Sequence, residues 1–235
     1  MRASQLPTTV SPMSSIRANT TPLFADDPLQ QLRQARFSGV EPQDIVRQAL
    51  EVARNPVVST NFRPRSAAFL HLVTRIAPEI PVIWVDTGYN TPATYRFADE
   101  VTRRLKLNLK TYSPLVTSAR RNALLGGVPR LDTPEHAEFT REVKLEPFER
   151  ALREHAPDVW LTGIRGEQTE FRRGLGVVSA GPFGTLRVAP IFAWSAVDLE
   201  DYLYEHGLPD NDDYVDPTKG SENRECGLQN MGSGI

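Results

Sequence analysis

The chain has 235 residues, with 27 lysines and arginines against 29 aspartates and glutamates, so its formal net charge is −2. This balance gives no reason to expect nucleic acid or an anionic membrane surface as a partner. No apolar run approaches the ~20 residues that cross a bilayer. The single cysteine, Cys226, excludes an internal disulfide, an all-cysteine zinc site and a four-cysteine iron–sulfur cluster within one chain.

The two ends of the chain differ from its middle. Residues 1–26 are polar, rich in Ser, Thr and Pro, and lack the apolar stretch of a secretory signal. We expect a flexible leader there, and a cytoplasmic protein whose lone thiol stays reduced. Residues 27–209 have the apolar patterning of one α/β domain. Residues 210–235 are polar, then glycine-rich, and are predicted to form a tail that carries Cys226.

Helices and strands alternate along the predicted domain. Apolar spacing and turn residues predict helices over 29–37, 42–53, 64–76, 92–105, 138–155 and 196–205, and strands over 57–60, 81–86, 107–112, 159–162 and 186–191. Thr91 before Pro92, and Ser195 with Asp198, are helix-start signals. Residues 119–134 are poorly periodic and are predicted to form a loop. This order predicts a mostly parallel sheet flanked by helices, with ligands at the carboxyl ends of the strands.

The loop after the first predicted strand carries hydroxyls and two arginines: Ser59, Thr60, Arg63, Arg65 and Ser66. Backbone N–H groups at a helix start favour anions, and hydroxyls and guanidinium groups strengthen that preference. The loop is therefore a candidate phosphate site. The alternative is an ordinary strand–helix turn with surface arginines.

Two further loops follow predicted strands. Asp86 and Gly88 end a buried strand, where an acid can hold nucleoside groups; the alternative is an aspartate that caps its own turn. Arg165 follows a later strand, with Arg172 just beyond it and Lys144 on the preceding helix. Clustered arginines suit a phosphate or sulfate because the guanidinium fork binds oxyanions bidentately. The alternative there is a solvated basic surface.

Cys226 lies in a polar segment beside Arg224, where a thiol has some thiolate character and is a candidate nucleophile. A lone cysteine is more often a small buried hydrophobe. No histidine spacing resembles a metal site.

Together these segments resemble the 3′-phosphoadenylyl-sulfate (PAPS) reductases of sulfate assimilation, over about residues 59–228. The resemblance is carried by Val85-Asp86-Thr87-Gly88-Tyr89, Val143-Lys144-Leu145-Glu146-Pro147, Gly163-Ile164-Arg165-Gly166-Glu167-Gln168 and Arg224-Glu225-Cys226-Gly227-Leu228. It implies an adenine nucleotide alpha hydrolase-like (Rossmann-like) fold. It also implies that the 59–66 loop contacts phosphate, that Asp86 and Gly88 contact the nucleoside, and that Lys144, Arg165 and Arg172 hold the 3′-phosphate and sulfate.

The resemblance implies that the Cys226 thiolate attacks the sulfo group, giving an S-sulfocysteine and adenosine 3′,5′-bisphosphate, and that thioredoxin or glutaredoxin releases sulfite. It also implies a homodimer. No bound cofactor is expected, since the paired cysteines of cluster-containing relatives are missing. Two alternatives stay open. One is an ATP-using hydrolase of the same fold that transfers sulfur. The other is a non-catalytic nucleotide-binding paralogue, because Arg63, Arg65 and Gln229 depart from the family pattern.

Overall fold

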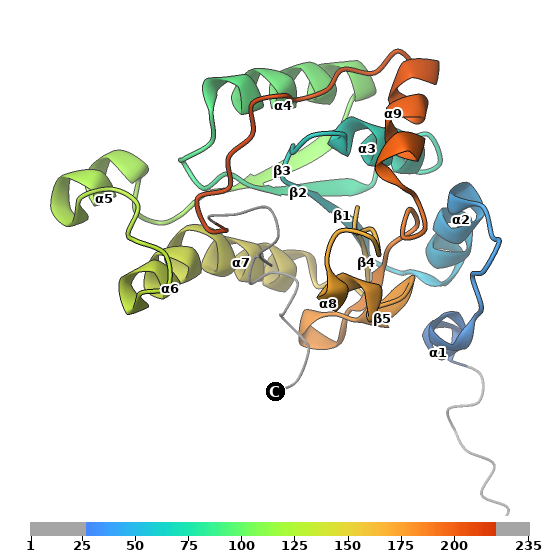
Figure 1. Cartoon of the computed structure of the whole chain (residues 1–235). Helices are drawn as coiled ribbons and strands as arrows, with labels where there is room; N and C mark the ends of the chain where they lie inside the picture. Colours follow the sequence, from blue (N-terminus) through green and yellow to red (C-terminus); the bar gives the residue numbers. More distant parts are fainter. Residues whose placement is uncertain (1–26, 220–235) are drawn as a thin grey trace, which may run out of the picture.

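A computed structural model describes residues 27–219, which contain one six-stranded sheet (Figure 1). The strands are β1 (Pro56–Thr60), β2 (Pro81–Val85), β3 (Asn108–Tyr112), β4 (Val159–Leu161), β5 (Val178–Ala180) and β6 (Leu186–Val188), in the spatial order β3-β2-β1-β4-β6-β5. Neighbouring strands are parallel except β5, which pairs antiparallel with β6. The predicted mostly parallel sheet is confirmed.

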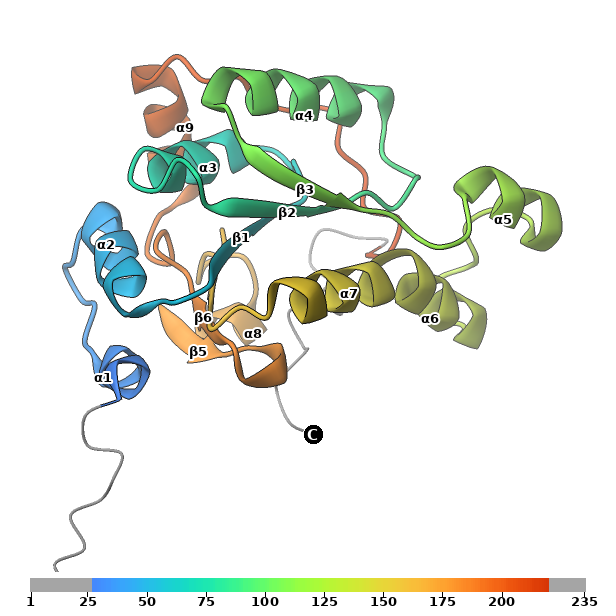
Figure 2. The same ribbon diagram turned by 180° about the vertical axis from the view of Figure 1, so that it is seen from behind.

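Helices cover both faces of this sheet (Figures 1 and 2). They are α1 (Pro28–Gln34), α2 (Pro42–Val52), α3 (Ser66–Thr74), α4 (Pro92–Leu105), α5 (Ser118–Leu125), α6 (Pro134–Thr140), α7 (Glu146–His155), α8 (Glu170–Arg173) and α9 (Ala196–Glu205). In both views α3, α4 and α9 lie on one side of the sheet and α7 on the other, while α5 projects beyond the sheet.

The central strands are apolar on both faces, and each face packs into its own core. Val58, Val82 and Leu161 join the larger core with the helices of the α3 side. Their strand neighbours Val57 and Ile83 face the other way and pack in a smaller core with α7. Because successive side chains of a strand point to opposite faces, a strand covered on both sides is a continuous apolar run, as its sequence indicated.

Several sequence predictions need correction. Residues 119–134 are not all loop, because α5 occupies their first part. The Thr117 side chain caps α5 by accepting from the Arg120 N–H, and Gly126 ends it in the left-handed region. Its apolar residues Leu124 and Leu125 are exposed, so no buried stripe marked it. The helix predicted over 138–155 begins earlier, at α6, and is interrupted by a π-helical turn, Arg141–Leu145.

The predicted helix starts agree with the structure. Thr91 caps α4 by accepting from the Thr94 N–H at 3.0 Å, and Ser195 and Asp198 form a capping box at α9. The three-residue strand β5 and the four-residue helix α8 were not predicted. Within residues 27–219 no helix has the length and apolar character needed to cross a membrane.

Candidate active site

The sheet order brings the predicted site loops to one edge. β1 lies between β2 and β4, and all three are parallel, so the loops that follow them leave the sheet side by side. One contact joins the first and third loops, and a second joins the strands β1 and β4 that precede them. The Arg63 guanidinium donates to the Gly163 carbonyl at 3.1 Å, and the Trp160 indole N–H donates to Ser59 Oγ at 2.8 Å.

The first loop makes a tight turn into α3. Thr60 Oγ1 accepts from the Phe62 N–H at 3.1 Å, and both Phe62 and Arg65 adopt left-handed backbone conformations, with φ of 50° and 63°. The turn ends at Ser66, whose Oγ is buried with no hydrogen-bond partner among residues 27–219. A buried hydroxyl without a partner costs free energy, so this atom marks a place where a ligand oxygen would be stabilising.

The two arginines of the first loop have different surroundings. Arg63 contacts the third loop, as described above. The Arg65 guanidinium is bound instead by Glu200 of α9, with Nε donating at 3.0 Å, and the Arg65 backbone N–H donates to Asp210 at 2.5 Å. The charge of Arg65 is therefore directed toward α9.

In the second loop, the Asp86 carboxylate stabilises its own turn. One oxygen accepts from the Gly88 N–H at 3.0 Å, the Asn90 amide at 2.9 Å and the Tyr95 hydroxyl at 2.8 Å. Burial, and then the hydrogen bond and charge of Asp86, raise the pKa of Tyr95 to about 12. Gly88 has a φ of +77°, and a Cβ there would lie 3.2 Å from Ser118. The turn-capping alternative therefore describes what Asp86 does within the described chain.

Three predicted cationic residues are buried at this edge: Lys144 at 4% exposure, Arg165 at 7% and Arg172 at 4%. Arg165 pairs with the half-exposed Glu167. Arg172 donates to the neutral Gln168 side chain, among other contacts. Burying a charge is costly unless it is paired, and the cations gathered here have partners within the chain, as the Arg165–Glu167 pair shows.

Sequence reasoning missed another buried cation, Arg187, which is 1% exposed. It donates to the Ala180 carbonyl at 2.9 Å, and its guanidinium lies 5.4 Å from the centroid of the Trp160 ring. An arginine within the apolar run from Leu186 to Ile191 was the sequence signal that could have revealed it.

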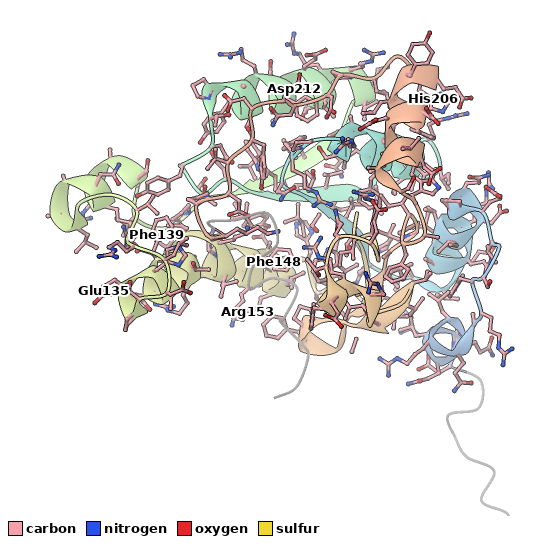
Figure 3. All side chains as sticks on the ribbon, viewed as in Figure 1. Glu135, Phe139, Phe148, Arg153, His206 and Asp212 are labelled. Carbon is pink, nitrogen blue, oxygen red and sulfur yellow. The ribbon has the colours of Figure 1, made fainter. Side chains whose placement is uncertain are left out.

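Residues 210–219, here called the strap, lie across the carboxyl edge of the sheet. Figure 1 shows them running from α9 along α4 and down toward α7, and Figure 3 shows Asp212 on the part above α4. The buried Asn211 amide donates to the Phe62 carbonyl at 2.9 Å and to Thr94 Oγ1 at 3.0 Å. Residues predicted to belong to the tail thus begin as an ordered part of the site.

The far end of the strap contacts Lys144. The Asp216 carboxylate pairs with the Lys144 ammonium, and the two side chains are 6% and 5% exposed. Thr218 adds donors to Asp216 from its N–H at 3.0 Å and its hydroxyl at 2.7 Å. Burial raises the pKa of Asp216, but the charge of Lys144 and these hydrogen bonds outweigh it and hold the pKa below its ordinary value.

The structure therefore brings the predicted cations, hydroxyls and loops together at the carboxyl edge of the sheet. A model of the phosphoadenosine phosphosulfate reductase domain matches residues 55–215, a span that contains all of these loops. The chain belongs to the phosphoadenosine phosphosulfate reductase family.

Named relatives agree with this assignment to the reductase family. The phosphoadenosine 5′-phosphosulfate reductase of Synechococcus sp. is 41% identical over 162 residues, covering 68% of this chain and 69% of the relative. That of Synechocystis sp. is 43% identical over 154 residues, covering 65% and 61%. The chain thus aligns with about two-thirds of the length of these relatives. Both are reductases, and the chain is accordingly an oxidoreductase.

A solved structure shares the fold. The phosphoadenylyl-sulfate reductase of Candida auris, described as a phosphate complex, superposes with a TM-score of 0.67 at 22% identity, covering 78% of this chain and 87% of that one. The predicted nucleotide-hydrolase-like α/β fold is confirmed.

Two residues of the sequence analysis lie beyond residue 219, where the described part of the chain ends. Cys226, the predicted nucleophile, lies outside the described residues, as does Gln229. Within residues 27–219 no group of three or more His, Cys, Asp or Glu side chains is placed to hold a metal ion.

Proposed function

We propose that this chain reduces PAPS to sulfite and adenosine 3′,5′-bisphosphate in sulfate assimilation. The observation that carries the proposal is the group of buried cations, Lys144, Arg165 and Arg172, at the carboxyl edge of a reductase-family sheet. PAPS has a 3′-phosphate and a 5′-phosphosulfate, so binding it requires several cationic or N–H donors. In this proposal these three residues hold the phosphate and sulfate groups.

The loops supply the remaining contacts in this proposal. Ser59, Thr60, Arg63 and Ser66 face the phosphate region from the first loop, and the buried Ser66 hydroxyl gains a partner there. Arg65, bound by Glu200, supports the loop rather than the ligand. Asp86 fixes the turn around Gly88, so that the nucleoside lies against backbone.

The chemistry needs one cysteine of this chain. The Cys226 thiolate attacks the sulfur of the sulfo group, forming an S–S bond as the S–O bond to the phosphate breaks. The products are S-sulfocysteine and adenosine 3′,5′-bisphosphate. A thiolate of a dithiol protein, thioredoxin or glutaredoxin, then attacks the Cys226 sulfur and releases sulfite. The second thiol of that protein resolves the mixed disulfide, so the dithiol supplies both electrons.

The proposal sets the cellular context as well. A reaction that consumes dithiol equivalents and depends on a free thiolate belongs in a reducing compartment, which we take to be the cytoplasm. No bound cofactor takes part, and we expect the enzyme to be a homodimer.

Two assays of the full chain test the proposal. Reduced protein incubated with PAPS, without thioredoxin, is expected to gain the mass of one sulfo group, and Cys226→Ser is expected to gain none. With reduced thioredoxin, only the unmodified chain is expected to form sulfite. Nucleotide binding without the added mass would contradict the mechanism and favour the non-catalytic paralogue. Pyrophosphate release from ATP would favour the sulfur-transferring hydrolase.

A further inference from the structure

The strap places a carboxylate where the proposed function needs a substrate anion. Asp216 accepts from the Lys144 ammonium, the Thr218 N–H and the Thr218 hydroxyl, and the Lys144 ammonium also contacts Thr218 Oγ1 at 3.2 Å. A phosphate or sulfate oxygen would use the same ammonium group. A ligand anion would therefore compete with Asp216 and Thr218 for the buried Lys144 ammonium.

The space beside Lys144 is closed by the same segment. A hollow of about 10 Å³ remains among Asn61, Thr87, Lys144, Tyr214 and Asp216, with neighbouring loop and strap residues completing its walls. A single water needs roughly 10–15 Å³ by such a measure. A phosphate group therefore does not fit until the strap moves.

Hydrogen bonds hold the strap at other points as well. Asp210 accepts from the Arg65 N–H at 2.5 Å, and the Asp213 carbonyl accepts from the Thr91 hydroxyl at 2.6 Å and the Thr94 hydroxyl at 3.2 Å. Asn211 binds the first loop and α4, as described above. The Asn61 amide donates to the Tyr214 hydroxyl at 2.8 Å, and His136 Nε2 lies 3.1 Å from the Pro217 carbonyl. Hydrogen bonds of this kind contribute little net stability each, because water replaces them when they open.

We propose that the strap is an autoinhibitory latch in which Asp216 occupies Lys144 until the anionic part of the nucleotide displaces it. The inference rests on the proposed function, which assigns Lys144 to the substrate anion. Cys226, the proposed nucleophile, follows the strap in the chain.

The latch predicts that the affinity for anionic ligands depends on the Lys144–Asp216 pair. Every ligand that uses Lys144 must first break the pair, and a charge-assisted contact of this kind is worth about a tenfold or larger change in affinity. Asp216→Asn removes the competing charge and is expected to bind adenosine 3′,5′-bisphosphate about tenfold more tightly. Adenosine, which lacks the anionic groups, is expected to bind Asp216→Asn and the unmodified chain equally.

Calorimetric titration of both ligands tests the latch. The matched control is Asp212→Asn, which removes the same charge from an exposed strap position and is expected to change affinity less than twofold. Asn211→Ala weakens the strap without touching Lys144 and is expected to tighten bisphosphate binding as well. It provides a second measurement if Asp216→Asn folds poorly.

The outcomes separate the latch from the proposed function. Equal bisphosphate affinity in the unmodified chain, Asp216→Asn and Asn211→Ala would overturn the latch and leave the proposed function standing. An equal gain for adenosine and the bisphosphate would also overturn it, because the strap would then block the site without competing for Lys144. No bisphosphate binding to any variant would overturn the proposed function and the latch with it.

Discussion

The amino and carboxyl edges of the sheet differ in cavity size and in the chemistry of their linings, and the larger cavity is not at the edge that carries the candidate site. The amino edge holds a cavity of about 420 Å³, lined by the segments around Arg54–Val57 and Ala77–Pro81 and by His155. The carboxyl edge holds a hollow of about 10 Å³ beside Lys144. Yet the carboxyl edge carries the buried cations Lys144, Arg165 and Arg172, and the Ser66 hydroxyl, which has no hydrogen-bond partner among residues 27–219. The proposed function therefore places the site by the chemistry of its lining, and the small volume at the carboxyl edge reflects the strap residues that line the hollow.

The largest expected effect is at the Lys144–Asp216 pair. Lys144→Met leaves Asp216 buried without its cation, and breaking a buried pair costs about 3 to 5 kcal/mol of unfolding free energy. We expect that loss in urea unfolding, together with at least a tenfold loss of affinity for adenosine 3′,5′-bisphosphate.

The double variant Lys144→Met with Asp216→Asn is the control, because it leaves no unpaired charge. It should recover most of the stability but none of the affinity. Recovery of both would mean that Lys144 is structural and that the carboxyl edge binds no anion through it.

A smaller effect is expected at the turn of the second loop. Gly88→Ala places an alanine at a φ of +77° and its Cβ 3.2 Å from Ser118, whereas Gly126→Ala has a similar φ of +79° and no atom within 4 Å. Both changes carry the left-handed strain of about 1 to 2 kcal/mol. Gly88→Ala alone should cost more than that, and it should weaken nucleotide binding. Equal costs in urea unfolding would show that the Ser118 approach is unimportant.

Acid should weaken the carboxyl edge in a predictable direction. In the folded chain the pKa of Asp216 lies below its ordinary value of 3.8. At pH values between these two pKa values, the Asp216 carboxylate is protonated in the unfolded chain and ionised in the folded chain. The contribution of the pair is complete above about pH 5 and declines as the pH falls through the folded pKa. In thermal melts the advantage of the unmodified chain over Asp216→Asn should therefore shrink on acidification. A constant difference between pH 6 and 3 would contradict the assigned pair.

The smallest effect is expected at the amino edge. Arg54 is an exposed cation on the rim of the large cavity, whereas Arg165 is a buried cation at the carboxyl edge. Arg54→Ala should leave bisphosphate affinity within about twofold, and Arg165→Ala should lower it by about tenfold or more. The reverse order in calorimetric titration would move the site to the large cavity.

Local sequence patterns predicted the elements whose signals are local. The buried strands β1, β2 and β4 are apolar runs, and α4 and α9 begin at capping residues. The helix α5 was missed because its leucines are exposed. The strand β5 was missed because it has only three residues, too few for a pattern, and pairs with β6 alone.

The candidate site shows the same limit. Arg165 and Arg172 were predicted because clustered cations after a strand are a local signal, and Lys144 was added from the helix that precedes this strand. The role of Asp216 could not, since its partner is 72 positions away and the strap is a polar segment without periodicity. Asp86 carried a local signal with two interpretations, and only the three donors around its oxygen distinguish them.

Hydrogen exchange of the full chain, with and without adenosine 3′,5′-bisphosphate, tests the central claim most directly. We predict slower exchange in the carboxyl-edge loops, residues 59–66 and 163–172, with faster exchange in strap residues 210–219 as Asp216 leaves Lys144. Residues 54–57 and 77–81 should not change. Ligand protection confined to those amino-edge segments would contradict the account.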